Sequence, residues 1–309
     1  MLSARTMAQS AALPMVLAAL STGPLRAQTI EDGALLPKRA LQTGLLYARD
    51  SWSNYWEGGL KRDNENIGTV TTQSVTWMAA YGVTDRLSVM AALPYVWTHA
   101  SQGPLHGMRG LQDVTFAAKY RLLSTPFTDH GRLRAIVVGV AGVPASDYTP
   151  DFLPLSIGLA SRRFSSRFTL NFQAHAGWFL NGSAGYTWRN KVTLDRPAYY
   201  TDGQLYLTDE VAMPAMFDYV ATLGYQRGRL CIPLSLAQQR TLGGGDIRRQ
   251  DMPFVSNRMD FVRAAAMVMY TLPAPRELGF HFGASRMLSG RNVGQATTLT
   301  GGMFYTFHL

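Results

Sequence analysis

Polar and ionisable side chains recur at every second position in several segments of this chain, which places them on one face of each segment. Asp113, Lys119 and Arg121 form one such set. Charges, amides and imidazoles on a common face can hydrogen-bond a small solute. We expect the solute-contacting set to be Asp113, Lys119, Arg121, Asn171, Gln173, His175, Asp218, Gln226, Gln239, Arg263 and His281. The same face carries apolar residues between them, namely Met78, Met90, Met267, Met269 and Phe304.

A second candidate chemistry lies in the pentapeptide 99–103, His-Ala-Ser-Gln-Gly. It resembles the His-x-Ser-Asn-Gly motif of outer-membrane phospholipases, in which an imidazole activates a serine and a third group orients the imidazole. His99 and Ser101 are expected on the outward-facing side of their segment. Gln112 is expected on the outward-facing side of the neighbouring segment, where it could orient the imidazole. However, Gln102 replaces the Asn of that family, and a polar loop gives a His-x-Ser spacing by chance. We predict that the protein is not an enzyme and keep the hydrolase as an alternative.

The remaining motifs indicate no cofactor and no resident metal. Residues 243–246, Gly-Gly-Gly-Asp, lack the Lys-Ser/Thr step of a phosphate-binding loop. Asp246, Asp251 and Asp260 lack the spacing of a calcium loop. Cys231 is the only cysteine, so it forms no internal disulfide and has no companion at metal-binding spacing.

The segments that carry these side chains alternate with a period of two, which indicates β-strands. The pattern occurs at 74–81, 87–97 and 113–123. Each run is about ten residues long, the length with which a tilted strand crosses a bilayer. Aromatic residues stand near the ends of the runs and charges stay on one face, as in a wall between lipid and a wetter lumen. The sequence predicts an all-β fold, an antiparallel transmembrane β-barrel.

The same period along the rest of the chain predicts about twelve strands, an even number as in single-chain bacterial barrels. We expect strands at 41–47, 74–81, 87–97, 113–123, 133–143, 155–163, 168–178, 217–225, 230–236, 261–270, 278–284 and 299–309. Short links at 82–86, 124–132, 164–167, 227–229 and 271–277 alternate with longer ones at 51–67, 98–110, 144–154, 179–212, 241–258 and 289–294. Residues 186–194 and 204–207 either extend strands or form a separate hairpin, so counts of ten and fourteen stay open.

Residues 1–27 are expected to be a secretory signal peptide, which leaves 28–309 as the barrel domain. Their Arg5 precedes a short apolar run at 11–20, and the cleavage position stays open. Residues 1–27 contain two arginines and no acidic residue, so the net charge falls from +9 to +7 on cleavage. The basic residues are scattered, which favours lipid phosphates and anionic solutes over nucleic acid. The mean hydropathy of −0.04 and the lack of long apolar runs exclude a helical membrane protein.

These features predict the bacterial outer membrane as the location, with both termini on the periplasmic side. The expected partners are outer-membrane lipids, the barrel-assembly machinery and a small solute. The sequence gives neither the identity of that solute nor its direction of movement.

Residues 87–95 and 110–122 resemble a family of bacterial outer-membrane barrels named for a meta pathway of phenol degradation. In that family, a Leu-Pro-Tyr step is followed by Gly-Leu-x-Asp and then by a strand ending in Lys-Tyr-Arg-Leu, as at 93–95, 110–113 and 119–122. Residues 143–147 resemble its Pro-x-Gly-Asp loop with Ser146 in place of Gly, and 289–292 resemble a later landmark. The match runs with gaps from about residue 70 to the C-terminus. The resemblance implies a transporter-like barrel for a small aromatic or hydrophobic solute.

Two roles of the inward-facing set stay open at this point. Its members either line a conduit or binding site, or pair with one another and plug a barrel that is mainly structural. The narrow interior expected for this strand number suits both arrangements.

Overall fold

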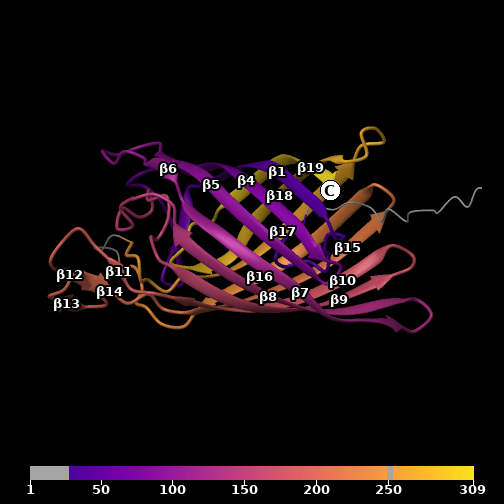
Figure 1. Ribbon diagram of the computed structural model, residues 1–309. Coiled ribbons are helices and arrows are strands. Elements are labelled where there is room, and N and C mark those ends of the chain that lie inside the picture. The colour runs from indigo at the N-terminus through magenta and orange to yellow at the C-terminus, as the bar shows by residue number, and fades with distance from the viewer. Residues whose placement is uncertain (1–27, 249–252) are drawn as a thin grey trace, which may run out of the picture.

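Antiparallel strands close into a barrel in the computed structural model, which describes residues 28–248 and 253–309 (Figure 1). The expected signal peptide at 1–27 lies outside the described residues. The main sheet has thirteen strand segments, and the short β6 (Arg109–Leu111) and β7 (Asp113–Phe127) both pair with β5, so they form one interrupted strand. The barrel therefore has the twelve strands that the sequence predicts.

Neighbours in the barrel follow chain order, and the first strand pairs with the last. Besides β6 and β7, the strands are β1 (Ala40–Trp52), β4 (Val70–Thr84), β5 (Leu87–Ala100), β8 (Gly131–Pro144), β9 (Arg163–Ala174), β10 (Trp178–Arg189), β15 (Met216–Arg227), β16 (Leu230–Thr241), β17 (Asp260–Thr271), β18 (Leu278–Arg291) and β19 (Thr297–His308). Three two-stranded sheets lie in the loops, formed by β2 (Asn54–Glu57) with β3 (Leu60–Asp63), β11 (Val192–Thr193) with β14 (Glu210–Val211), and β12 (Tyr199–Thr201) with β13 (Gln204–Tyr206). No helix long and apolar enough to cross a membrane occurs in the described residues.

Short turns and long loops lie at opposite ends of the barrel. Turns of a few residues join β4 to β5, β7 to β8, β9 to β10, β15 to β16 and β17 to β18. The longer loops gather at the other end, where β11–β14 extend beyond the barrel, and the C-terminus lies at the short-turn end (Figure 1). This arrangement confirms the expected alternation of links.

Side chains alternate between lipid and lumen along each strand, most regularly on β10. Its even-numbered residues, including Trp178 and Leu180, are exposed, whereas Phe179 and Asn181 are buried. Outward aromatic rings pair near both ends of the wall, because aromatic side chains suit the two membrane interfaces. Trp178 packs on Tyr225 at the short-turn end, with ring centroids 5.0 Å apart.

One strand predicted from the sequence is wrong, and one strand of the structure was missed. Residues 155–163 form a loop up to Arg162, because Leu155 and Ile157 bury their side chains among other loop residues and inward positions instead of facing lipid. The link predicted at 164–167 lies inside β9. The strand β10 was not predicted, and most of its residues fall within the predicted 179–212 loop. It was missed because Gly182 and its small neighbours weaken the alternating signal. One strand too many and one too few offset each other, which left the count correct.

Candidate functional site in the barrel lumen

Residues 28–37, here called the N-terminal segment, lie inside the barrel before the first strand begins. Lys119 of β7 has a fully buried side chain, and its Nζ donates hydrogen bonds to Asp32 Oδ1 at 2.6 Å and to the carbonyl oxygen of Thr29 at 2.8 Å. The backbone N–H of Gln28 points to Gln42 Oε1 of β1 at 3.3 Å. These contacts hold the segment against the inner wall.

The inner face of β8 explains why the N-terminal segment stays there. Successive inward residues Ile136, Val138 and Val140 are apolar and buried, although this face would meet water in an open lumen. Ile30 and Leu35 of the segment pack against them. Apolar area removed from water stabilises by about 25 cal/mol per Å². Sequence reasoning missed this segment, although residues 135–143 of the neighbouring strand are apolar on both faces, which indicates that the inward face is covered.

The main lumen cavity has a volume of about 520 Å³ and borders residues 28–32 of the N-terminal segment. Its walls come from inward residues of β1, β4, β5, β7, β10 and β15–β19. Most of its lining surface is apolar, and the largest apolar side chains are thioethers and aromatic rings, namely Met78, Met90, Met267, Met269, Phe179 and Phe304. The acids Glu31 and Asp32 of the N-terminal segment also border it. Methionine side chains are flexible and polarisable, so they adapt to apolar guests of different shape. The cavity suits a small, mainly apolar molecule.

A second cavity of about 430 Å³ lies toward the short-turn end. Residues 33–37 form one of its sides, and Gln28 borders both cavities. Polar side chains line the rest, namely Arg121, Arg134, Gln173, His175 and Gln226. The N-terminal segment therefore stands between an apolar and a polar compartment.

The expected solute-contacting residues divide into three groups. Arg263 and His281 line the main cavity. Four line the second cavity, namely Arg121, Gln173, His175 and Gln226. The remaining members are engaged with other protein groups: Lys119 with Asp32, Asn171 with Asn181 at 2.7 Å, Asp218 with Arg167, Gln239 with the carbonyl oxygen of Met259 at 3.0 Å, and Asp113 with Tyr148.

The Asp113 contact ties the wall to a long loop. Tyr148 donates its hydroxyl hydrogen to Asp113 Oδ1 at 2.6 Å. Burial raises the pKa of Tyr148 well above its ordinary value, and the hydrogen bond to Asp113 adds to that shift. The phenol therefore stays neutral and remains a donor throughout the physiological range.

Three buried polar groups of residues that line the main cavity are left for a guest, namely Gln28 Oε1, His281 Nδ1 and Arg263 Nε. His281 is 4% exposed, and no partner for its Nδ1 occurs among the described residues. The same holds for the Nε of Arg263 within the described part of the chain. A buried polar group without a hydrogen bond is costly. A solute that bonds to one of these three groups would remove part of that cost.

The alternative hydrolase site does not assemble in the structure. Ser101 Oγ accepts the backbone N–H of Thr69 at 2.8 Å, and Gln112 Nε2 donates to the buried carbonyl oxygen of Ile157 at 2.5 Å. The pairing register shifts by one residue between β6 and β7, so the expected outward phase of Gln112 is wrong. No hydrogen bond joins His99, Ser101 and Gln112 among the described residues.

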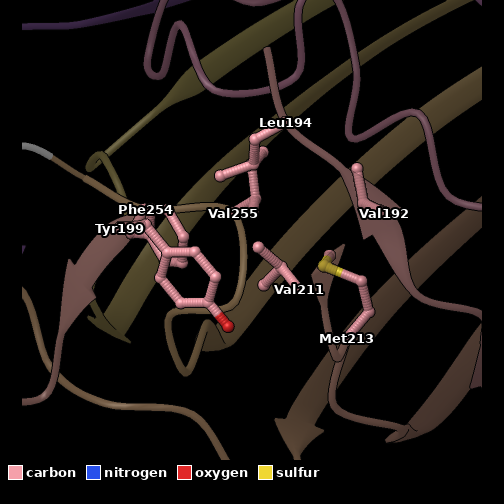
Figure 2. Close-up of a cluster of buried hydrophobic side chains, with 7 residues drawn as sticks. All are labelled: Val192, Leu194, Tyr199, Val211, Met213, Phe254 and Val255. Carbon is pink, nitrogen blue, oxygen red and sulfur yellow. The ribbon is translucent and has the colours of Figure 1, made fainter. Parts of the chain in front are cut away.

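The long loops build an apolar core of their own, which sequence reasoning also missed (Figure 2). Its buried members are Val192, Leu194, Tyr199, Val211, Met213, Phe254 and Val255. Tyr199 stacks on both Tyr206 and Phe254, with centroids 5.1 Å apart in each pair. Residues 190–215 and 253–255 therefore form a packed unit at the long-loop end.

Comparisons with known proteins agree with this architecture. A family model described as "Putative MetA-pathway of phenol degradation" matches residues 60–225. Among solved structures, the COG4313 outer membrane channel from Pseudomonas putida F1 is similar at 15% identity with a TM-score of 0.70, over 92% of this chain and 100% of that chain. The translocator domain of the autotransporter NalP from Neisseria meningitidis is more distant, at 11% identity and a TM-score of 0.46, over 90% of this chain and 91% of that one. No curated protein matches. The first likeness confirms the fold.

Proposed function

Because the chain belongs to the MetA-pathway phenol-degradation family, we propose that it is an outer-membrane channel that binds and passes a small, mainly apolar solute. The Pseudomonas putida protein of the same fold is described as an outer membrane channel, which supports this role. The observation that carries the proposal is the apolar lumen cavity of about 520 Å³. The family's description makes a phenol-like aromatic compound the first solute to test.

The proposed orientation places the short turns and both termini in the periplasm and the long loops outside the cell. Bacterial barrels have short periplasmic turns and longer extracellular loops, which supports this choice. In the same proposal, residues 1–27 direct export, 28–309 form the barrel domain, and the barrel-assembly machinery inserts it among outer-membrane lipids.

The solute-contacting residues act at two stages of the proposed path. Arg263 and His281 bind the solute in the main cavity, and Arg121, Gln173, His175 and Gln226 meet it in the second one. Asp113, Lys119, Asn171 and Asp218 act indirectly, because their pairings shape the lumen. We propose no catalytic step.

A barrel with a sealed lumen is the second candidate function. Two observations favour it, since the N-terminal segment fills part of the lumen and several inward charges pair with each other. In that case the protein binds a solute without passing it, or serves a structural role.

Planar-bilayer recording of the full-length protein tests the proposal. We expect discrete conductance events that shorten when benzyl alcohol or benzoate is added. Replacing Ala265, which lines the main cavity, by Phe is expected to lower conductance and aromatic-solute binding together. The matched control is Ala184→Phe, because Ala184 is exposed on the outer face. Conductance and solute binding that are both absent from the wild type would leave only the structural role.

A further inference from the structure

Two arginines point outward from the barrel wall on either side of β19. Arg49 of β1 pairs with Leu299, and Arg286 of β18 pairs with Thr297. Both side chains are exposed and share the outward phase of apolar residues such as Leu45 and Phe282. Strand spacing and rise place their Cα atoms about 12 Å apart. Two long, flexible side chains at this separation can reach one headgroup.

Neither arginine is neutralised by the protein. Among the described residues, Arg49 and Arg286 form no ion pair and donate no side-chain hydrogen bond. The acid next to Arg49 in sequence, Asp50, instead accepts a hydrogen bond from Thr298 at 2.8 Å. Two unpaired guanidinium groups thus stand where the strands approach the long loops.

An apolar groove of about 690 Å³ runs along the outer wall and ends at Arg286 and Thr297. Its outward lining consists of the small residues Ala221, Ala264, Ala266 and Ala284 and of the leucines Leu180, Leu223, Leu234 and Leu236. The groove lies on the lipid-facing side of β10 and β15–β18. Its apolar lining suits an acyl chain.

The charge at the end of the groove selects the kind of lipid. Toward the long loops, outward positions of β10 and β15 carry the aromatic pair Tyr186 and Phe217, whereas β18 presents Arg286. A guanidinium group matches the geometry of phosphate oxygens, and the attraction is strong at the edge of a hydrocarbon layer. We propose that Arg49 and Arg286 bind the phosphate of a lipid A-type glycolipid, one acyl chain of which occupies the groove. This site rests on the orientation proposed above, and does not depend on channel activity.

Native mass spectrometry of the delipidated, refolded full-length barrel with added lipid A tests the site. We expect one tightly retained lipid A per barrel. Arg49→Gln/Arg286→Gln should weaken its binding about 30-fold, since each arginine near anionic lipid contributes a similar share. Ala266→Leu should also weaken binding by filling the groove while keeping both charges.

Matched variants and a second lipid complete the experiment. Arg162→Gln removes an exposed arginine beside β9, which four strands separate from β18, and should leave binding unchanged. Ala184→Leu enlarges an outward alanine outside the groove and should also have no effect. Equal retention of lipid A by the double-arginine variant would overturn the proposal, as would equally tight retention of phosphatidylglycerol. Each variant is scored only on barrels that show the heat-dependent gel mobility of the folded wild type, and loss of conductance alone has no bearing on the result.

Discussion

The Nζ atom of Lys119 lies 2.6 Å from Asp32 Oδ1, and the lysine side chain has no exposed surface. This pair joins the barrel wall to the N-terminal segment and sits beside the boundary between the two lumen cavities. A fully buried cation tolerates its position only while its partner is present.

Removing the carboxylate should therefore loosen the N-terminal segment. We predict that Asp32→Asn destabilises the folded barrel by on the order of 3 kcal/mol, because it leaves the Lys119 charge buried and unpaired. Lys119→Met combined with Asp32→Asn should recover part of the loss, which a double-mutant cycle measures by urea unfolding in lipid bilayers. Asp129→Asn, in an exposed turn, is the control. Equal losses in the single and double variants would contradict a direct pairing.

The imidazole of His281 should contribute to solute affinity. We predict that His281→Phe weakens binding of a hydroxyl- or carboxylate-bearing aromatic solute by about fivefold, the scale of one lost hydrogen bond. Binding of an aromatic hydrocarbon of similar size should change little. Titration calorimetry with both solutes measures the difference, and His308→Phe, near the exposed C-terminus, is the control. A uniform loss for both solutes would point to altered packing instead.

Acid should release the loop that Asp246 anchors. Hydrogen bonds from Arg291, assisted by Asn292, hold the pKa of Asp246 below its ordinary value. A carboxyl group whose pKa is lowered by folding stabilises the fold above its unfolded pKa, near 4, and loses that effect as pH falls through the folded value. We predict constant protection of residues 242–248 from pH 8 to about 5 and a loss below about 4.

Hydrogen exchange corrected for intrinsic rates checks this pH dependence. Asp246→Asn should show the loosened loop already at neutral pH. Asp209→Asn, at an exposed loop position, should behave as the wild type. Full protection of the loop in Asp246→Asn would show that Asp246 is not its anchor.

The core of the long loops should melt separately from the barrel. Val211 is 1% exposed in that core, so Val211→Ala should destabilise it by on the order of 2 kcal/mol. Limited proteolysis should then cut residues 190–215 faster while the barrel keeps its heat-dependent gel mobility. Leu207→Ala, at a side chain that is 83% exposed, is the control. Simultaneous loss of the barrel would mean that loops and wall form one cooperative unit.

The period of two was enough to predict the closed barrel and the lumen side of the polar set, whereas the strand number was correct because two errors offset each other. It failed at 155–163, because alternation does not distinguish burial against lipid from burial within a loop core. It also failed on β10, where glycine and alanine occupy the outward positions 182 and 184. Helical or strand periods describe regular elements, so the irregular N-terminal segment carried no periodic signal.

The site was only partly accessible from the sequence for a related reason. The alternation of side chains along a strand shows which residues face the lumen. It does not show which of them pair with other protein groups and which remain available to a solute. Lys119 and His281 look alike in the pattern, yet one is bonded to Asp32 and the other borders the main cavity without a partner for its Nδ1 among the described residues. The outward phase expected for Gln112 was wrong because a one-residue register shift between β6 and β7 has no trace in the alternation.

The ladder between β1 and β19 sets the order of events during biogenesis. It joins the two ends of the chain over Ala40–Ser51, so it cannot form until β19 has been delivered. The N-terminal segment is continuous with β1 and ends beside Ala40 and Ala80, where Leu36 is buried. The barrel consequently has an open seam next to the segment until β19 pairs with β1. Closing that seam encloses the segment, so the segment cannot enter or leave the lumen through the wall once β1 and β19 are paired.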